Sequence, residues 1–104
     1  TLFRSPRTAA PTEASARGKA LFERADVACA TCHTGPRLSK PGFFQGVGGM
    51  FQVPSLVGVS THPPYFHTGC ATSLKELRCG VGAHETSHLT ADERADLASY
   101  LETL

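Results

Sequence analysis

Small and apolar side chains recur at helical spacing in two stretches, one near each end of the chain. In residues 12–25, the residues that share one helical face are Ala14, Gly18, Leu21, Phe22 and Ala25. In the last stretch, the apolar stripe consists of Leu97, Leu101 and Leu104, flanked by Ala98 and Tyr100. These patterns predict two amphipathic helices, one from about 13 to 25 and one from about 91 to 103.

Threonines mark the start of both predicted helices. Thr12 is positioned to cap the first helix, and Thr90 begins a Thr-x-x-Glu capping box that ends at Glu93. Gly18 interrupts the apolar face of the first helix, where a glycine costs about 1 kcal/mol relative to alanine. We expect another helix to approach closely at Gly18, because the missing side chain leaves room for it.

The pattern between these helices is irregular. Residues 41–59 mix glycines with aromatic and aliphatic residues, which predicts a loop and is compatible with a short hairpin between about 43 and 53. Three prolines exclude a regular helix across most of residues 53–69. Ser73 and Glu76 form a Ser-x-x-Glu box, which predicts a short helix that ends near residue 79.

The complete pattern predicts an all-α domain with three to five helices and long loops rich in glycine and proline. A chain of 104 residues forms one small domain, here 12–104, and residues 1–11 are predicted to be a linker or N-terminal arm. The formal net charge of +1 provides no basic surface for nucleic acid, and no apolar run approaches the ~18 residues of a membrane span. The chain begins at Thr1 without a signal region, so we expect a processed protein or an excised domain.

One short motif carries recognisable chemistry: Cys29-Ala30-Thr31-Cys32-His33 has the spacing of a c-type haem attachment site. Two thiols on one helical turn reach the two vinyl groups of one porphyrin, and the next residue places an imidazole under the iron. A thioredoxin-type site would need a βαβ pattern, which is not visible. A zinc site would need two more closely spaced ligands, whereas eight residues separate Cys70 from Cys79.

The predicted cofactor is therefore one covalent haem c, held by Cys29, Cys32 and His33. The second ring nitrogen of His33 then needs an acceptor, for which we expect a backbone carbonyl near Pro36. Other residues expected at the haem are Phe44, Met50, Phe51, Leu56, Tyr65 and His67. Of these, His67 is expected to hydrogen-bond a propionate or a backbone group.

Haem c is attached outside the cytoplasm in bacteria, so we expect a periplasmic or otherwise exported protein. In such a compartment a disulfide between Cys70 and Cys79 is favoured over the alternative of two buried free thiols. A continuous α-helix would hold the two Cα atoms too far apart for that bond, so the chain is expected to bend between them.

The motif and the two terminal helices resemble a cytochrome c domain. In that family the first and last helices cross at a glycine–aromatic contact, which Gly18 and Phe22 match against Leu97, Tyr100 and Leu101. Within the family, three segments are similar to the C-terminal haem domain of the bacterial di-haem cytochrome c peroxidase group, namely 53–56, 64–69 and 73–77. The resemblance covers about residues 17–104.

Two departures from that group bear on function. Only one haem motif is present, so the companion peroxidatic haem domain is absent from this sequence. The position where these peroxidases carry a Met or Tyr falls near Gly80 and Val81, and neither residue binds iron. Relatives with a Gly-Ala-His-x-Thr-Ser segment look closer, which here is residues 82–87.

The distal iron ligand decides between an electron carrier and an enzyme, because only an open face admits peroxide or gas. His84 is the favoured ligand, since it lies shortly before the last helix, where class I cytochromes also supply theirs. Met50, the one methionine, is the second candidate, followed by His88 and His67. His62 is interpreted as an exposed loop histidine.

The predicted function is electron transfer through one haem, between redox proteins or between haem domains. The alternative is a peroxidase-like enzyme with an open or displaceable distal site, for which Glu85 beside His84 is the candidate acid–base group. A haem sensor or a structural haem module has no positive sign in the sequence.

Overall fold

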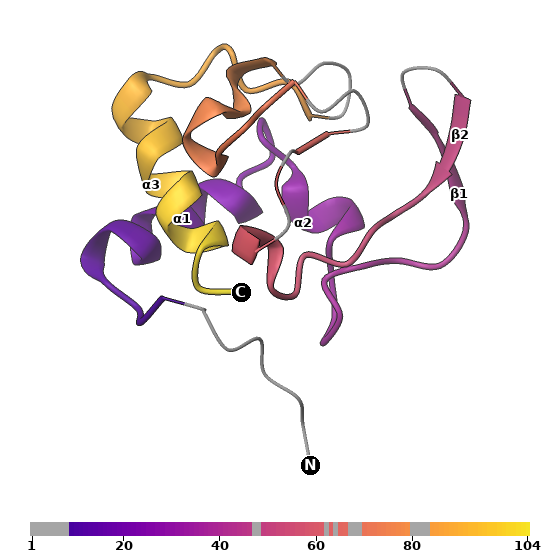
Figure 1. Cartoon of the computed structure of the whole chain (residues 1–104), viewed down its shortest axis with the longest axis horizontal. Helices are drawn as coiled ribbons and strands as arrows, with labels where there is room; N and C mark the ends of the chain where they lie inside the picture. Colours follow the sequence, from indigo (N-terminus) through magenta and orange to yellow (C-terminus); the bar gives the residue numbers. More distant parts are fainter. Residues whose placement is uncertain (1–8, 47–48, 62, 64, 67–69, 80–83) are drawn as a thin grey trace.

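A computed structural model describes residues 9–46, 49–61, 63, 65–66, 70–79 and 84–104 of the chain. Its elements are α1 (Glu13–Glu23), α2 (Cys29–Cys32), β1 (Phe43–Gly46), β2 (Gly49–Gln52), the 3-10 turns η1 (Val59–Thr61) and η2 (Leu74–Cys79), and α3 (Ala91–Leu101). Figure 1 shows α1 and α3 packed together, with the other helical turns around them and the two strands to one side. The regular structure of the described residues is mostly helical, as the sequence predicts.

Threonine caps start α1 and α3 as expected. The Ser15 N–H donates to Thr12 Oγ1 at 3.1 Å, and the Thr12 N–H donates to Ser15 Oγ at 2.8 Å. The Glu93 N–H donates to Thr90 Oγ1 at 3.1 Å, and Glu93 Oε1 accepts from the Thr90 N–H at 2.9 Å. Both helices end two residues before their predicted ends, at Glu23 and Leu101.

Gly18 is where α1 and α3 touch. A Cβ atom at Gly18 would lie 2.7 Å from the Tyr100 Cβ and would collide with the carbonyl group of Asp96. One turn along, the rings of Phe22 and Tyr100 meet edge to face, with centroids 5.2 Å apart and planes at 64°. The predicted close approach at Gly18 is thus confirmed, and the crossing is the one expected from the cytochrome c resemblance.

The buried core forms around this crossing. Leu97 is 1% exposed and Phe22 is 3% exposed, and they pack with side chains from the loops that follow α2 and precede α3. The other buried apolar residues are Leu21, Val27, Tyr65, Ala71, Leu74, Leu89, Ala98 and Leu101. The two terminal helices therefore form the scaffold on which the intervening loops are arranged.

The predicted hairpin is present as β1 and β2. The strands pair antiparallel, with Phe44 opposite Phe51 and Gln45 opposite Met50. In Figure 1 this ribbon stands apart from the helices. Met50 on β2 is 56% exposed, so its thioether faces solvent in this arrangement.

The second capping box predicted in the middle of the chain is not formed. Instead of capping at Ser73, the Glu76 carboxylate accepts from the Thr72 N–H at 3.1 Å and from the Thr72 hydroxyl at 2.7 Å. Glu76 itself departs from helical geometry, with φ −96° and ψ 23°, so η2 is a pair of tight turns joined by a kink. The expected bend between residues 70 and 79 is confirmed.

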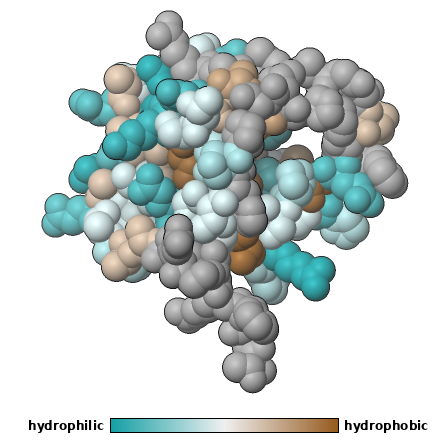
Figure 2. Space-filling model, viewed as in Figure 1, coloured by the Kyte–Doolittle hydropathy of each residue, from teal (hydrophilic) through white to brown (hydrophobic). Residues whose placement is uncertain are grey.

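One face of the molecule is predominantly polar in its described part (Figure 2). On the face drawn in Figure 2, hydrophilic residues cover most of the coloured area and apolar residues form small separate areas. Among the helices that the structure describes, none has the length and hydropathy to cross a lipid bilayer.

Candidate functional site

The candidate site begins at α2, a single helical turn that follows a residue with left-handed backbone angles. Ala28, just before the turn, has φ +58°, and the Ala28 N–H donates to the carbonyl of Arg24 at 2.7 Å. The His33 N–H then donates to the carbonyl of Cys29 at 3.0 Å, which closes the turn. Cys29 and Cys32 lie on this turn as partly buried free thiols.

The environment of Cys29 is unlike that of a redox-active thiol. Burial raises the pKa of the Cys29 thiol to about 11. Reactive cysteines of thioredoxin type have a lowered pKa, because nearby positive charge stabilises the thiolate. The thioredoxin alternative therefore gains no support from the environment of this motif.

His33 is held by one ring nitrogen. The residue is 9% exposed, and its Nδ1 lies 2.9 Å from the carbonyl oxygen of Leu38. Because a carbonyl only accepts, Nδ1 carries the proton and Nε2 keeps its lone pair. This tautomer is the one that a metal-binding imidazole with Nε2 as the ligand requires.

The acceptor differs from the predicted one in position but not in kind. We expected a backbone carbonyl near Pro36, and the structure uses Leu38, two residues further along. Leu38 has φ +52°, a left-handed conformation that turns its carbonyl back toward the ring. Pro36 itself is exposed.

His84, the favoured distal ligand, faces an aromatic ring. The ring centroids of Phe66 and His84 are 5.1 Å apart, with planes inclined at 49°. His84 is exposed on one side, yet surrounding protein lowers the pKa of its imidazole, and the charge of His33 lowers it further. The two histidines are therefore near enough to interact electrostatically, although 51 positions separate them in the sequence.

The remaining ligand candidates have other environments. His88 Nε2 lies 3.2 Å from Asp26 Oδ2, in a surface cluster that includes Arg24 and Glu93. Met50 is exposed on the hairpin. His62 and His67 lie outside the described residues.

Other predicted cofactor contacts fall into two groups. Tyr65 is buried in the core, where its N–H donates to the Ala71 carbonyl at 2.7 Å, and Leu56 packs partly buried against the same core. The side chains of Phe44 and Phe51 lie outside the described part of the structure.

Cys70 is disulfide-bonded. This agrees with the favoured interpretation of the second cysteine pair. The side chain of Cys79, its predicted partner, lies outside the described part of the structure, so that pairing stays a prediction.

Two residues at the site had no role assigned from sequence. Leu38 carries no local signal, because a leucine with positive φ is not marked by its residue type. Phe66 belongs to the Pro-Tyr-Phe-His segment that carried the family resemblance, but its contact with His84 joins separate loops. Phe66 also has a positive φ, of 64°.

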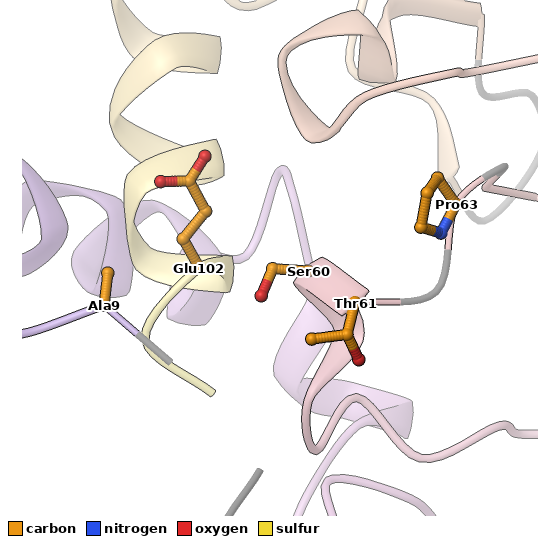
Figure 3. Close-up of a pocket in the computed structure, with 5 residues that line it drawn as sticks. All are labelled: Ala9, Ser60, Thr61, Pro63 and Glu102. Carbon is orange, nitrogen blue, oxygen red and sulfur yellow. The ribbon is translucent and has the colours of Figure 1, made fainter. Parts of the chain in front are cut away.

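A separate hollow of about 520 Å³ lies away from this site. Figure 3 shows Glu102 at the end of α3 beside Ser60 and Thr61 of η1, with Ala9 on one side and Pro63 on the other. None of these residues belongs to the predicted site. Across the described ranges, no three His, Cys, Asp or Glu side chains gather in a metal-binding cluster.

Comparison with known proteins identifies a similar fold. No family model matches the chain, and no curated protein matches its sequence. A solved structure of Kuenenia stuttgartiensis hydrazine synthase, pressurised with 20 bar of xenon, contains a chain similar to this one, with 25% sequence identity and a TM-score of 0.74. The match covers 97% of this chain and 50% of the other, so this chain spans about half the length of its structural neighbour. Together with the α1–α3 crossing, the likeness supports a cytochrome c-like fold.

Proposed function

We propose that Cys29 and Cys32 hold one haem c through thioether bonds, with His33 as the proximal iron ligand, and that the domain transfers electrons. The observation that carries this proposal is the state of His33: Nδ1 is engaged at 2.9 Å by Leu38, which leaves Nε2 as a ligand. The two free thiols lie on the turn that ends at this residue. The donor set therefore fits the group that the motif predicts.

When bound, the haem supplies a one-electron iron couple, and the chain sets the environment of that couple. The Leu38 carbonyl fixes the orientation and basicity of the His33 ring. The helical scaffold of α1 and α3 holds the motif in place through the Gly18 contact. Cys29 packs partly buried against the core from the side of α2.

His84 is the proposed distal ligand. Two observations support this assignment. Burial, and then the charge of His33, lower the pKa of His84, and the ring centroid of Phe66 lies 5.1 Å from that of His84. Met50 is exposed on the hairpin, and His88 is paired with Asp26, so both have weaker support. Two histidine ligands favour a lower reduction potential than a histidine and a methionine.

The enzymatic alternative has no comparable support. Glu85 Oε1 accepts from the Ser87 N–H at 2.7 Å, and hydrogen bonds from the Ser87 side chain and backbone lower the pKa of the carboxyl group. A carboxylate held in its own loop as an anion is poorly suited to deliver a proton to peroxide. Electron transfer is therefore the function we propose.

The partners we propose are other redox proteins or other haem domains. The likeness to half of a longer chain supports an association with further domains. We also propose a periplasmic or otherwise exported location, which the disulfide at Cys70 supports, because such bonds persist in oxidising compartments.

An optical titration tests the proposal. The protein is produced with export and with a c-type haem attachment system, and its ferric and ferrous spectra are recorded with and without cyanide, CO and peroxide. A six-coordinate low-spin spectrum that ignores all three additions is the expected result. A high-spin ferric spectrum that changes on adding peroxide would instead favour the enzyme.

A further inference from the structure

The carbonyl that holds His33 lies in a tightly turned segment. The Leu38 N–H donates to the Gly35 carbonyl at 3.0 Å, and the Ser39 N–H donates to the Thr34 carbonyl at 3.0 Å. Within this turn Leu38 adopts φ +52°, a conformation that side chains branched like leucine seldom occupy. Contacts from outside the turn are therefore needed to keep the Leu38 carbonyl aimed at the imidazole.

Two serine hydroxyls make those contacts. One bonds to the residue before Leu38, and the other belongs to the residue after it. Ser55 Oγ donates to the carbonyl of Arg37 at 2.5 Å, and Ser39 Oγ donates to the carbonyl of Val53 at 2.6 Å. Both bonds join the turn to the same short segment, residues 53–55. We call Ser39 and Ser55 the serine pair.

The segment that the serine pair holds is itself anchored to the core. Ser55 Oγ also accepts from the Val57 N–H at 3.1 Å, and Leu56 packs partly buried against the core cluster. Two residues on, the Gly58 N–H donates to the Leu104 carbonyl at 2.8 Å, just beyond α3. The orientation of the Leu38 peptide is thus connected through the serine pair to the end of the helical scaffold.

We propose that Ser39 and Ser55 are positioning residues that keep the Leu38 carbonyl on His33 Nδ1 and thereby set the electron donation of His33 to iron. The part that concerns iron rests on the proposed function, whereas the part that concerns the His33 proton does not. Outer hydrogen bonds to a ligating histidine fix its orientation and raise its basicity. Loss of the serine pair frees the Leu38 peptide to rotate, so the Nδ1–H loses its acceptor and the imidazole becomes a weaker donor.

The variants are Ser39→Ala, Ser55→Ala and Ser55→Thr, with Ser99→Ala as the matched control. Ser99 Oγ donates to the Ala95 carbonyl at 3.0 Å on α3, so its removal deletes a comparable hydrogen bond away from His33. Ser55 is exposed, which leaves room for the extra methyl group of threonine. The Thr variant keeps the hydroxyl and is expected to behave as the wild type does.

Two readouts are made on the protein as purified. The first is the exchange rate of the His33 Nδ1 proton by ¹⁵N-edited NMR of the reduced protein, which is expected to rise at least tenfold in both Ala variants. The second is the reduction potential, expected to rise because a weaker donor stabilises the ferric state less. The expected rise is about 28 mV, which for a one-electron couple corresponds to a roughly threefold increase in the ratio of ferrous to ferric protein at a fixed solution potential.

The outcomes separate the two proposals. If the wild type carries no haem, the proposed function fails, and the exchange rate of the His33 proton alone decides on the serine pair. Wild-type exchange rates in both Ala variants would overturn the positioning role, as would an equal change in Ser99→Ala. If Ser39→Ala does not fold, Ser55→Ala decides, because replacing an exposed side chain leaves no cavity.

Discussion

At the residue scale, the two histidines of the site differ in how they are held. His33 is fixed through Nδ1 by a carbonyl, whereas His84 is supported by the ring of Phe66 and sits in a loop. If His84 is the distal ligand, His84→Ala removes it and converts the ferric haem from low spin to high spin. The measurement is the ferric absorption spectrum. His88→Ala, at a histidine paired with Asp26, is the control and leaves the spectrum unchanged; a low-spin spectrum in His84→Ala would rule His84 out.

Phe66 supplies a second prediction at this scale. Removing a group that orients a metal ligand typically costs about 10–100-fold in metal affinity or activity. Phe66→Ala is therefore expected to bind CO or cyanide at concentrations that leave the wild type six-coordinate, with His84 displaced about 10–100-fold more readily, as measured by equilibrium titration. Phe66→Tyr retains the ring and is expected to match the wild type. A Phe66→Ala protein that ignores CO and cyanide as the wild type does would show that the 5.1 Å ring contact has no such role.

The sequence predicts that the three motif residues lie on one helical turn, which the structure confirms, but it does not locate the groups that support them. Cys29, Cys32 and His33 form a contiguous motif whose spacing encodes the chemistry. The acceptor for His33 was expected near Pro36 and is Leu38, because a left-handed leucine has no signature in the residue type. The Phe66–His84 contact joins segments that only the folded chain brings together.

At the element scale, the α1–α3 crossing depends on a missing side chain. In Gly18→Ala the new Cβ would collide with the Asp96 carbonyl, and overpacking of this kind costs about 1–3 kcal/mol in the free energy of unfolding. The loss is expected although alanine is the better helix former. Urea unfolding is the measurement.

The control is Ala16→Gly, on the exposed side of the same helix. There the methyl group stabilises the helix, so its removal costs about 0.5–1 kcal/mol. A methyl group is thus predicted to act in opposite directions at residues 16 and 18. A Gly18→Ala protein as stable as the wild type would show that the two backbones separate at little cost.

The ion pairs of Asp26 with Arg24 and His88 make the free energy of unfolding depend on pH. The hydrogen bond from Arg24 lowers the pKa of Asp26 to about 2, and the charge of His88 contributes. Because the folded pKa lies below the ordinary value of 3.8, the Asp26 carboxylate stabilises the fold above that value and loses this effect as pH falls toward 2. Asp26→Asn is expected to flatten the fall in the urea midpoint between about pH 4 and pH 2, whereas Asp92→Asn is not. Equal slopes in the two variants would contradict the prediction.

Local sequence signals identify elements where the backbone is regular. The threonine caps at Thr12 and Thr90 start α1 and α3 as predicted, because each satisfies free N–H groups of a helix that continues for three turns. The same pattern at Ser73 predicted the short helical segment that ends at Cys79, which is present as η2, but the capping contact itself is not formed. There the chain kinks at Glu76, and the carboxylate reaches Thr72 instead.

At the scale of the whole molecule, the parts of the site come from opposite directions along the chain. His33 ends the turn α2 that follows α1, and His84 lies in the loop before α3. In the folded chain burial, and then the charge of His33, lower the pKa of His84. Helical periodicity and the Gly18 interruption predict the packing of α1 against α3. The position of the hairpin does not follow from the sequence, because its alternating residues specify pairing but not the surface it adjoins.

One measurement decides whether the chain carries a covalent haem. The mature protein, exported and exposed to a haem attachment system, is digested and analysed by mass spectrometry with thiol alkylation. We predict that the peptide containing Cys29–His33 is heavier by one haem and that neither of its cysteines reacts with the alkylating reagent. An unmodified peptide with both thiols alkylated would contradict the proposed function.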